Sequence, residues 1–237
     1  MPRIALLCGL LIIIPLSLPA QEVLRGRVQI DMEPVYALAE GTAYPLDAGT
    51  ARRRALEEAS LFFSAMIYGW SFTYEIGEQA RGTAENFELA PQGTIAFGDA
   101  GLFVTDADIH DSRFSVWADY RLSASQKRRV ELWRAGGVRN LQAAGHAPLA
   151  AGPENTAESD EPAEMPGWIA MKNAALEDAA KAGIRAMLRS GERNRPKEAR
   201  GFIALAEFPR YYLEAGQWAV SARFRAEITE IVPFAVY

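Results

Sequence analysis

The densest group of side chains that could do chemistry lies at residues 106–111. Four residues, Asp106, Asp108, His110 and Asp111, place three carboxylates and one imidazole within six positions. Carboxylate oxygens and imidazole nitrogens bind divalent cations, so this group is a weak candidate for a metal site. The spacing starts like a calcium-binding loop, but it has no glycine at its sixth position and no glutamate at its twelfth. A polar turn between strands uses the same aspartates for local hydrogen bonds, and we favour this interpretation.

Signatures of enzymatic catalysis are missing from the sequence. A serine or cysteine nucleophile needs a positioned base, and the two histidines are His110 and His146, the second in a segment that we expect to be a linker. No nucleophile elbow, phosphate-binding glycine loop or dinucleotide-binding turn is present. Two of the 30 acidic residues could converge for glycoside cleavage, but no local pattern selects a pair. We therefore expect a protein that is not an enzyme and that has no cofactor.

Two further features are weak candidates for partner binding. Trp117 lies on the nominally polar face of a predicted strand whose other face is apolar. It is either buried against another part of the chain, which we favour, or offered to a partner. Arg193, Arg195 and Lys197 form a basic group in a loop, which is either a solvated face or a contact for an acidic partner or lipid headgroups. The formal net charge of −5 argues against nucleic acid as a partner.

The first 20 residues predict an exported protein. Arg3 precedes an apolar run over residues 4–14, which is followed by two prolines and Ala20. This layout is typical of a secretory signal peptide, so we expect cleavage after Ala20 and a periplasmic or secreted mature protein. An uncleaved membrane anchor is the alternative, because Leu18 is large for its position before a cleavage site. No second long apolar stretch follows, so we expect no transmembrane span after signal cleavage.

A segment rich in alanine, proline and glutamate divides the mature chain at residues 144–166. Such a composition buries little apolar surface, so it predicts a flexible linker or long loop. The first unit then covers residues 21–143, and the second covers residues 167–237.

Both units contain a helix pattern followed by a strand pattern. Residues 55–59 read Ala-Leu-Glu-Glu-Ala and residues 175–179 read Ala-Leu-Glu-Asp-Ala, each within an apolar stripe of helical period. Residues 114–122 and 218–226 alternate apolar and mostly polar side chains, as half-buried strands do. The sequence therefore predicts an α+β fold of two related units, each an amphipathic helix packed on an antiparallel sheet, with the second unit an abridged copy.

The expected helices cover residues 48–67 and 168–189. Further strands are expected over residues 23–31, 70–76 and 85–89, one or two more over residues 93–105, and another over residues 201–206. The last of these should pair with residues 217–229 through a turn near residues 214–216.

Three stretches of the first unit carry a family resemblance: Ala-Glu-Gly-Thr-Ala at residues 39–43, Ala-Arg-Arg-Arg-Ala-Leu-Glu-Glu-Ala at residues 51–59, and the strand pattern at residues 114–122. With them, residues 23–122 resemble the amino-terminal domain of flagellar assembly protein T. The stretch is also similar to small outer-membrane lipoproteins that share a glycine-containing strand, an alanine-rich helix and a sheet. The resemblance implies a periplasmic or outer-membrane-associated α+β domain that works by protein contact, in the flagellar case in a ring around the motor shaft.

Two functions from different classes are therefore open. The favoured one is a noncatalytic structural or interaction protein of the periplasm or envelope, with envelope or flagellar proteins as partners. The alternative is a periplasmic protein that binds a small ligand or a divalent metal, at residues 106–111 or in a cleft between the two units. The first predicts stable partners without turnover, and the second predicts stabilisation by its ligand.

Overall fold

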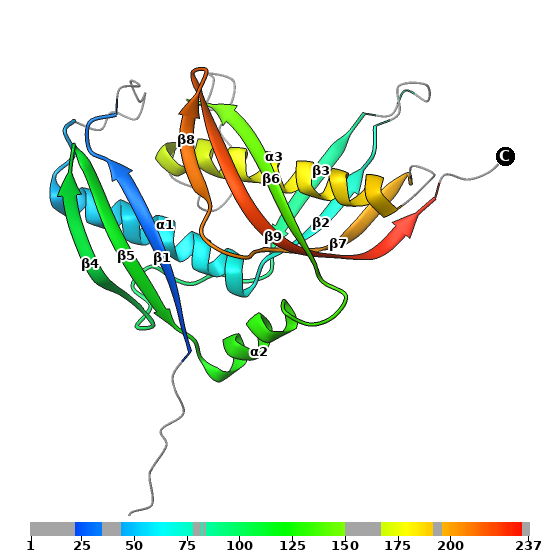
Figure 1. Cartoon of the computed structure of the whole chain (residues 1–237), viewed down its shortest axis with the longest axis horizontal. Coiled ribbons are helices and arrows are strands. Elements are labelled where there is room, and N and C mark those ends of the chain that lie inside the picture. The colour runs from blue at the N-terminus through cyan, green and yellow to red at the C-terminus, as the bar shows by residue number, and fades with distance from the viewer. Residues whose placement is uncertain are drawn as a thin grey trace, which may run out of the picture.

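A computed structural model of the chain describes residues 22–34, 44–77, 82, 84–149, 167–191 and 196–233 (Figure 1). The elements in chain order are β1 (Val23–Asp31), α1 (Ala48–Ile67), β2 (Trp70–Glu75), β3 (Asn86–Pro91), β4 (Leu102–His110), β5 (Arg113–Arg121), α2 (Ala124–Leu132), β6 (Arg139–Pro148), α3 (Gly167–Gly191), β7 (Glu198–Leu205), β8 (Arg210–Glu214) and β9 (Gln217–Val232). The strands of these ranges pair antiparallel, which confirms the predicted α+β class. No helix in the described part of the chain is long and apolar enough to cross a membrane. The predicted signal peptide lies outside the described residues.

The smaller sheet has the strand order β1-β5-β4. Apolar and polar residues alternate along β1, which buries Leu24, Val28 and Ile30 on one face. α1 packs against β1 and β5. Fully buried alanines of α1, including Ala55 and Ala59, let the helix axis lie close to the strands.

The larger sheet has the order β3-β2-β7-β9-β6, and β8 pairs with the first part of β9. α3 packs against β6 and β9. The contact is close at Gly145 of β6, where an added Cβ would lie 2.2 Å from the backbone nitrogen of Ala179. Only a residue without a side chain fits under α3 at this point.

The predicted linker over residues 144–166 needs a correction at its start. β6 extends to Pro148 and pairs with β9 along its whole length. The alanines and glycine of this strand are small because α3 lies directly on them, whereas the composition alone indicates a segment with little to bury. Residues 150–166 lie outside the described residues.

The two predicted units do not have separate sheets. β2 and β3 come from the first unit, yet β2 pairs with β7 of the second. β6 also precedes the predicted boundary and lies in the larger sheet. The elements β1-α1-β4-β5 and β6-α3-β7-β9 do share one order, with the last strand between the other two in each sheet. The internal repeat stays a prediction, and its second copy would begin at β6.

Three elements have no counterpart in the expected pattern: α2, β6 and β8. β7 pairs with β9 as expected, but the turn at residues 215–216 joins β8 to β9. The strand expected over residues 93–105 begins only at Leu102. α2 starts with a capping box between Ser123 and Gln126 and buries Val130 alone, so it has no apolar stripe to reveal it.

Candidate functional site

A groove of about 600 Å³ borders both β1 and β8, which belong to different sheets. We call it the β1–β8 groove. Glu58 and Phe62 of α1 and Lys172 of α3 line it together with Trp117 of β5. The other lining residues belong to β1 (Arg27, Val28 and Gln29) and to the segment that leads into β8 (Glu207, Phe208, Pro209, Arg210 and Tyr211). The groove thus collects residues from both sheets and from both long helices.

The groove runs beside the open edge of β1. Side chains of successive strand residues point to opposite faces, so the three consecutive residues 27–29 can line one groove only if it follows the edge of the strand. Within the described part of the chain, β1 pairs with β5 and with no other strand. Its second edge is therefore unpaired where it borders the groove.

The hydrogen-bond ladder shows which backbone groups of β1 face this edge. The nitrogen of Met32 donates to the carbonyl oxygen of Ser112 at 2.8 Å, and the register between β1 and β5 is uninterrupted. Bonded and non-bonded pairs alternate in an antiparallel ladder, so the even-numbered residues of β1 bond to β5. The backbone N–H and C=O groups of Arg27 and Gln29 therefore point toward the groove.

A buried ion pair lies at the floor of the groove. Nζ of Lys172 lies 3.0 and 2.9 Å from the two carboxylate oxygens of Glu58. The side chains are only 10% and 3% exposed. Lys172 also lies 5.4 Å from the ring centroid of Tyr211 and 5.3 Å from that of Trp218, as cation–π contacts do. The pair thus ties α1 to α3 and to the sheet of β8 and β9.

The floor shifts the pKa values of two groups. Burial raises the pKa of the Glu58 carboxyl, and the Lys172 ammonium opposes that rise. Burial also raises the pKa of Tyr211 well above its usual value, and the charge of Glu58 adds to this. The Tyr211 phenol therefore stays neutral at physiological pH.

Stacked aromatic side chains form one wall of the groove. The ring of Phe62 lies 5.1 Å from that of Phe208, edge to face, and 6.0 Å from that of Tyr211. Phe208 also contacts Phe63 at 4.8 Å between ring centroids. An added Cβ at Gly26 would lie 2.3 Å from the Phe208 ring, so this ring sits directly on β1. These contacts hold the segment before β8 in place beside β1 and α1.

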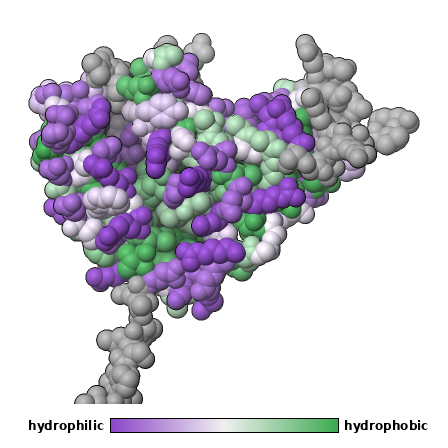
Figure 2. All heavy atoms as spheres, in the orientation of Figure 1, coloured by the Kyte–Doolittle hydropathy of each residue, from purple (hydrophilic) through white to green (hydrophobic). Residues whose placement is uncertain are grey.

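The rim of the groove carries positive charge. Arg27 donates to Oγ of Ser115 at 3.2 Å, and among the described residues neither Arg27 nor Arg210 has a carboxylate within ion-pair distance. Glu207 faces Arg223 at 3.5 Å, so its charge is already matched. Figure 2, in the orientation of Figure 1, shows polar and apolar side chains interspersed over this side of the molecule. The unmatched cations favour an acidic group in the groove.

Trp117 is not buried by the rest of the chain, contrary to the favoured expectation. The residue is 41% exposed and lines the groove. It stands between Arg27 of β1 and Asp106 of β4 in the register of the smaller sheet, on the face away from α1. The chain therefore leaves this aromatic surface open.

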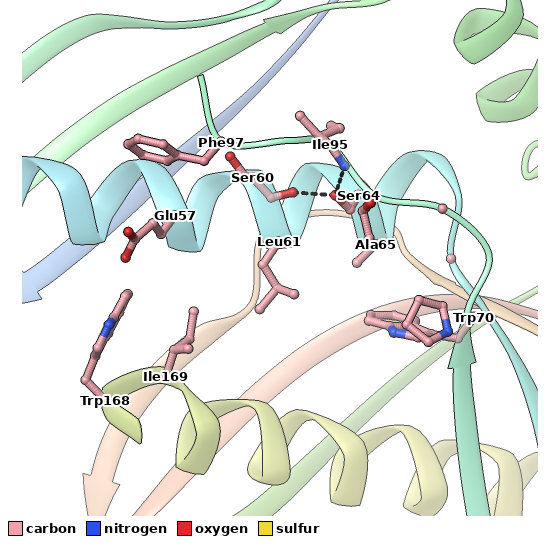
Figure 3. A pocket seen from close by; sticks show the side chains of 14 residues that line it. Glu57, Ser60, Leu61, Ser64, Ala65, Trp70, Ile95, Phe97, Trp168 and Ile169 are labelled. Carbon is pink, nitrogen blue, oxygen red and sulfur yellow. Dashed lines mark hydrogen bonds between the residues drawn. The ribbon is translucent and has the colours of Figure 1, made fainter. Parts of the chain in front are cut away.

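A second pocket, of about 360 Å³, lies between α1, the first turn of α3 and residues 93–97 (Figure 3). In Figure 3, Leu61 of α1 points toward α3, with Trp168 and Ile169 below it and Trp70 at the other end. We call this the apolar pocket.

Two serine hydroxyl groups in the wall of the apolar pocket already make hydrogen bonds to the backbone. Oγ of Ser60 donates to the carbonyl oxygen of Leu56 at 2.9 Å. Oγ of Ser64 donates to the carbonyl oxygen of Ser60 at 2.6 Å and accepts from the nitrogen of Ile95 at 2.8 Å. The pocket therefore offers mainly apolar contact surface.

The candidate metal residues lie on β4 and in the turn after it. Asp106, Asp108 and His110 alternate along one face of β4, while Asp111 and Ser112 form the turn with positive φ angles of 48° and 56°. The turn interpretation thus fits Asp111, but the other three residues belong to a strand. In the described ranges, no group of three or more His, Cys, Asp or Glu side chains could hold a metal ion.

The remaining candidates lie elsewhere. The backbone nitrogen of Lys197 donates to the carbonyl oxygen of Val232 at 2.8 Å, at the start of the larger sheet. Arg193 and Arg195 lie outside the described residues. His146 is not in a linker but in β6, where its ring lies 3.5 Å from a carboxylate oxygen of Glu214.

Sequence reasoning missed the floor of the groove, although a signal for it exists. Lys172 lies one helical turn before Leu176 and two turns before Ala180, and so extends the apolar stripe of α3. Glu58 stands in the same relation to Phe62 of α1. A charged residue in line with an apolar stripe indicates a buried charge that needs a partner.

Comparison with known proteins extends over both sheets. A protein-family model matches residues 13–234. An uncharacterized protein of Treponema pallidum (strain Nichols) is 23% identical over 218 residues, which are 90% of this chain and 84% of that protein. No solved structure gives a significant match. The matched region includes every residue of the β1–β8 groove and of the apolar pocket.

Proposed function

We propose that this chain, which belongs to the protein family whose model spans residues 13–234, is a noncatalytic interaction protein of the cell envelope. The observation that carries the proposal is the β1–β8 groove, which brings together an exposed tryptophan with a strand edge that has no strand partner and two arginines that have no carboxylate partner among the described residues. Tryptophan, tyrosine and arginine dominate the binding energy of protein interfaces. The partner is accordingly a protein.

The expected signal peptide supports a location in the envelope. The resemblance of residues 23–122 to flagellar assembly protein T supports flagellar proteins among the partners. In this proposal the buried pair of Glu58 and Lys172 holds α1 and α3 together, so that the groove keeps its shape when a partner leaves.

Replacing Trp117 with alanine should weaken binding of the partner. The tagged protein is crosslinked in the envelope of its native cell, and the recovery of each captured protein is compared with the wild type by isotope labelling. We expect at least a roughly tenfold loss of the partner, because truncation of a central aromatic anchor costs about 2 kcal/mol or more.

Leu132 provides the matched control, because it is 68% exposed on α2 and lies outside the groove. Leu132→Ala should capture the same proteins as the wild type. Equal recovery with Trp117→Ala and with the wild type would contradict the proposal.

The apolar pocket favours a second candidate function, the binding of a small apolar ligand. The uncharged probe N-phenyl-1-naphthylamine should bind there and gain fluorescence, because its rings can contact Trp70, Trp168 and Leu61. Leu61→Trp should abolish this gain by filling the pocket, whereas Leu132→Trp should leave it unchanged. A gain that survives Leu61→Trp would place the probe elsewhere and exclude this function for the pocket.

A further inference from the structure

We propose that the open edge of β1 binds an extended acidic segment of a partner protein, which adds to the smaller sheet as a fourth strand inside the β1–β8 groove. The inference rests on the proposed function and names the kind of partner. The occupant is an extended segment in which acidic and apolar residues alternate.

The backbone of β1 presents hydrogen-bonding groups to the groove. The N–H and C=O groups of Arg27 and Gln29 face the groove, because the even-numbered residues of β1 take up the bonds to β5. Unpaired groups of an edge strand pair readily with an extended chain. The groove gives such a chain access along residues 27–29.

The opposite wall offers a second strand edge. Ala215 and Gly216 form a two-residue turn with φ angles of 49° and 76°, so the hairpin of β8 and β9 closes on the pair Glu214 and Gln217. Glu214 and Gln217 form a hydrogen-bonded pair, and bonded and non-bonded pairs alternate along the hairpin. Tyr211 is therefore in a non-bonded pair, and its backbone N–H and C=O groups point away from β9. Tyr211 also lines the groove, so a segment beside β1 meets β8 on its other side.

The side chains of the groove select the composition of the segment. Arg27 points to the face away from α1, whereas Val28 is buried on the face toward it. Side chains of an added strand alternate in the same way and meet their cross-strand neighbours. Residues on the outer face therefore meet Arg27, with Trp117 one strand further in on β5, and residues on the inner face meet Phe62.

The positive charge of the groove favours acidic residues on the outer face of the added strand. Glu58 is paired with Lys172, and Glu207 is paired with Arg223. These pairs leave Arg27 and Arg210 as the cations that a ligand can neutralise. A segment with glutamate or aspartate at alternate positions satisfies both requirements.

Fluorescence anisotropy with defined peptides tests the inference on the purified full-length mature protein. The probe is a fluorescein-labelled peptide of sequence Glu-Val-Glu-Val-Glu-Val. We expect saturable binding, and at least tenfold weaker binding of Lys-Val-Lys-Val-Lys-Val and of the glutamate peptide N-methylated at alternate residues. The methylated peptide keeps the charge but loses the donors that pair with a strand edge.

Variants of the protein assign the binding to the edge of β1. Gln29→Pro should abolish it, since the nitrogen of Gln29 faces the groove and takes no part in the ladder with β5. Gln29→Ala, which keeps the N–H, should bind as the wild type does. The double variant Arg27→Glu with Arg210→Glu should reverse the preference and bind the lysine peptide.

The inference would be overturned by no binding of the glutamate peptide, by equal binding of its methylated form, or by equal binding to Gln29→Pro and Gln29→Ala. A concentration-dependent dimer that Gln29→Pro abolishes would make a second copy of the chain the occupant and would also overturn it. If the glutamate peptide does not bind while Trp117→Ala still loses its partner in the envelope, the proposed interaction function is supported and only the proposed added strand is wrong.

Discussion

Replacing Lys172 with methionine should lower the free energy of unfolding by about 3–5 kcal/mol at neutral pH, because it leaves the Glu58 carboxyl buried without its counter-charge. The double variant Glu58→Leu with Lys172→Met should recover most of this loss, since an apolar pair of similar volume replaces a buried ion pair at little cost. Urea unfolding followed by circular dichroism measures both.

The loss in Lys172→Met should shrink in acid. The folded-state pKa of Glu58 is raised, so the stability that its protonated form contributes is present below its usual value of 4.5 and is lost as the pH rises through the folded-state pKa. Removal of Lys172 raises that pKa further. The difference from the wild type should therefore be smaller at pH 4 than at pH 7.5. An equal difference at both pH values, or a loss below about 1 kcal/mol, would show that the pair is not buried as described.

Replacing Gly145 with alanine should lower the free energy of unfolding by about 3 kcal/mol, because the new methyl group would overlap the backbone of α3 near Ala179. Gly136→Ala is the matched control, since nothing lies within 4 Å of its added Cβ, and it should change stability by less than about 0.5 kcal/mol. Thermal unfolding of the two variants gives the comparison. Equal stability of both would mean that residues 144–148 are a linker and not a strand under α3.

Elements with a one-sided apolar pattern were predictable from the sequence. The pattern over residues 48–67 and the observed α1, Ala48–Ile67, have the same bounds, and so do the pattern over residues 23–31 and β1. α3 extends the predicted helix over residues 168–189 by a few residues at its ends. Each of these elements buries one face, so the spacing of apolar residues in its sequence matches the side that is buried.

Two kinds of feature were not predictable. β6 uses alanine and glycine where α3 lies close, and this composition is indistinguishable from that of a loop until the helix is placed. The pairing of β2 with β7 joins residues 70–75 to residues 198–203, and no local period encodes such a contact. Sequence reasoning therefore did not predict the larger sheet, to which strands from before and after the expected linker both contribute.

The site was predictable only in part. Trp117 stands out because a large aromatic residue interrupts the polar face of a strand. Glu58 and Lys172 are 114 residues apart, so their pairing depends on how α1 and α3 meet. The acidic cluster at residues 106–111 is dense in sequence, but β4 spreads three of its residues along an exposed strand.

Site-specific photocrosslinking in the native envelope tests whether the partner occupies the β1–β8 groove. The photoreactive amino acid benzoylphenylalanine would replace Gln29 at the open edge of β1 and, in a second strain, Leu132 on α2. We predict one covalent adduct of defined mass from position 29 and none from position 132. An adduct from position 132 with none from position 29 would contradict the account, because the partner would then bind outside the groove.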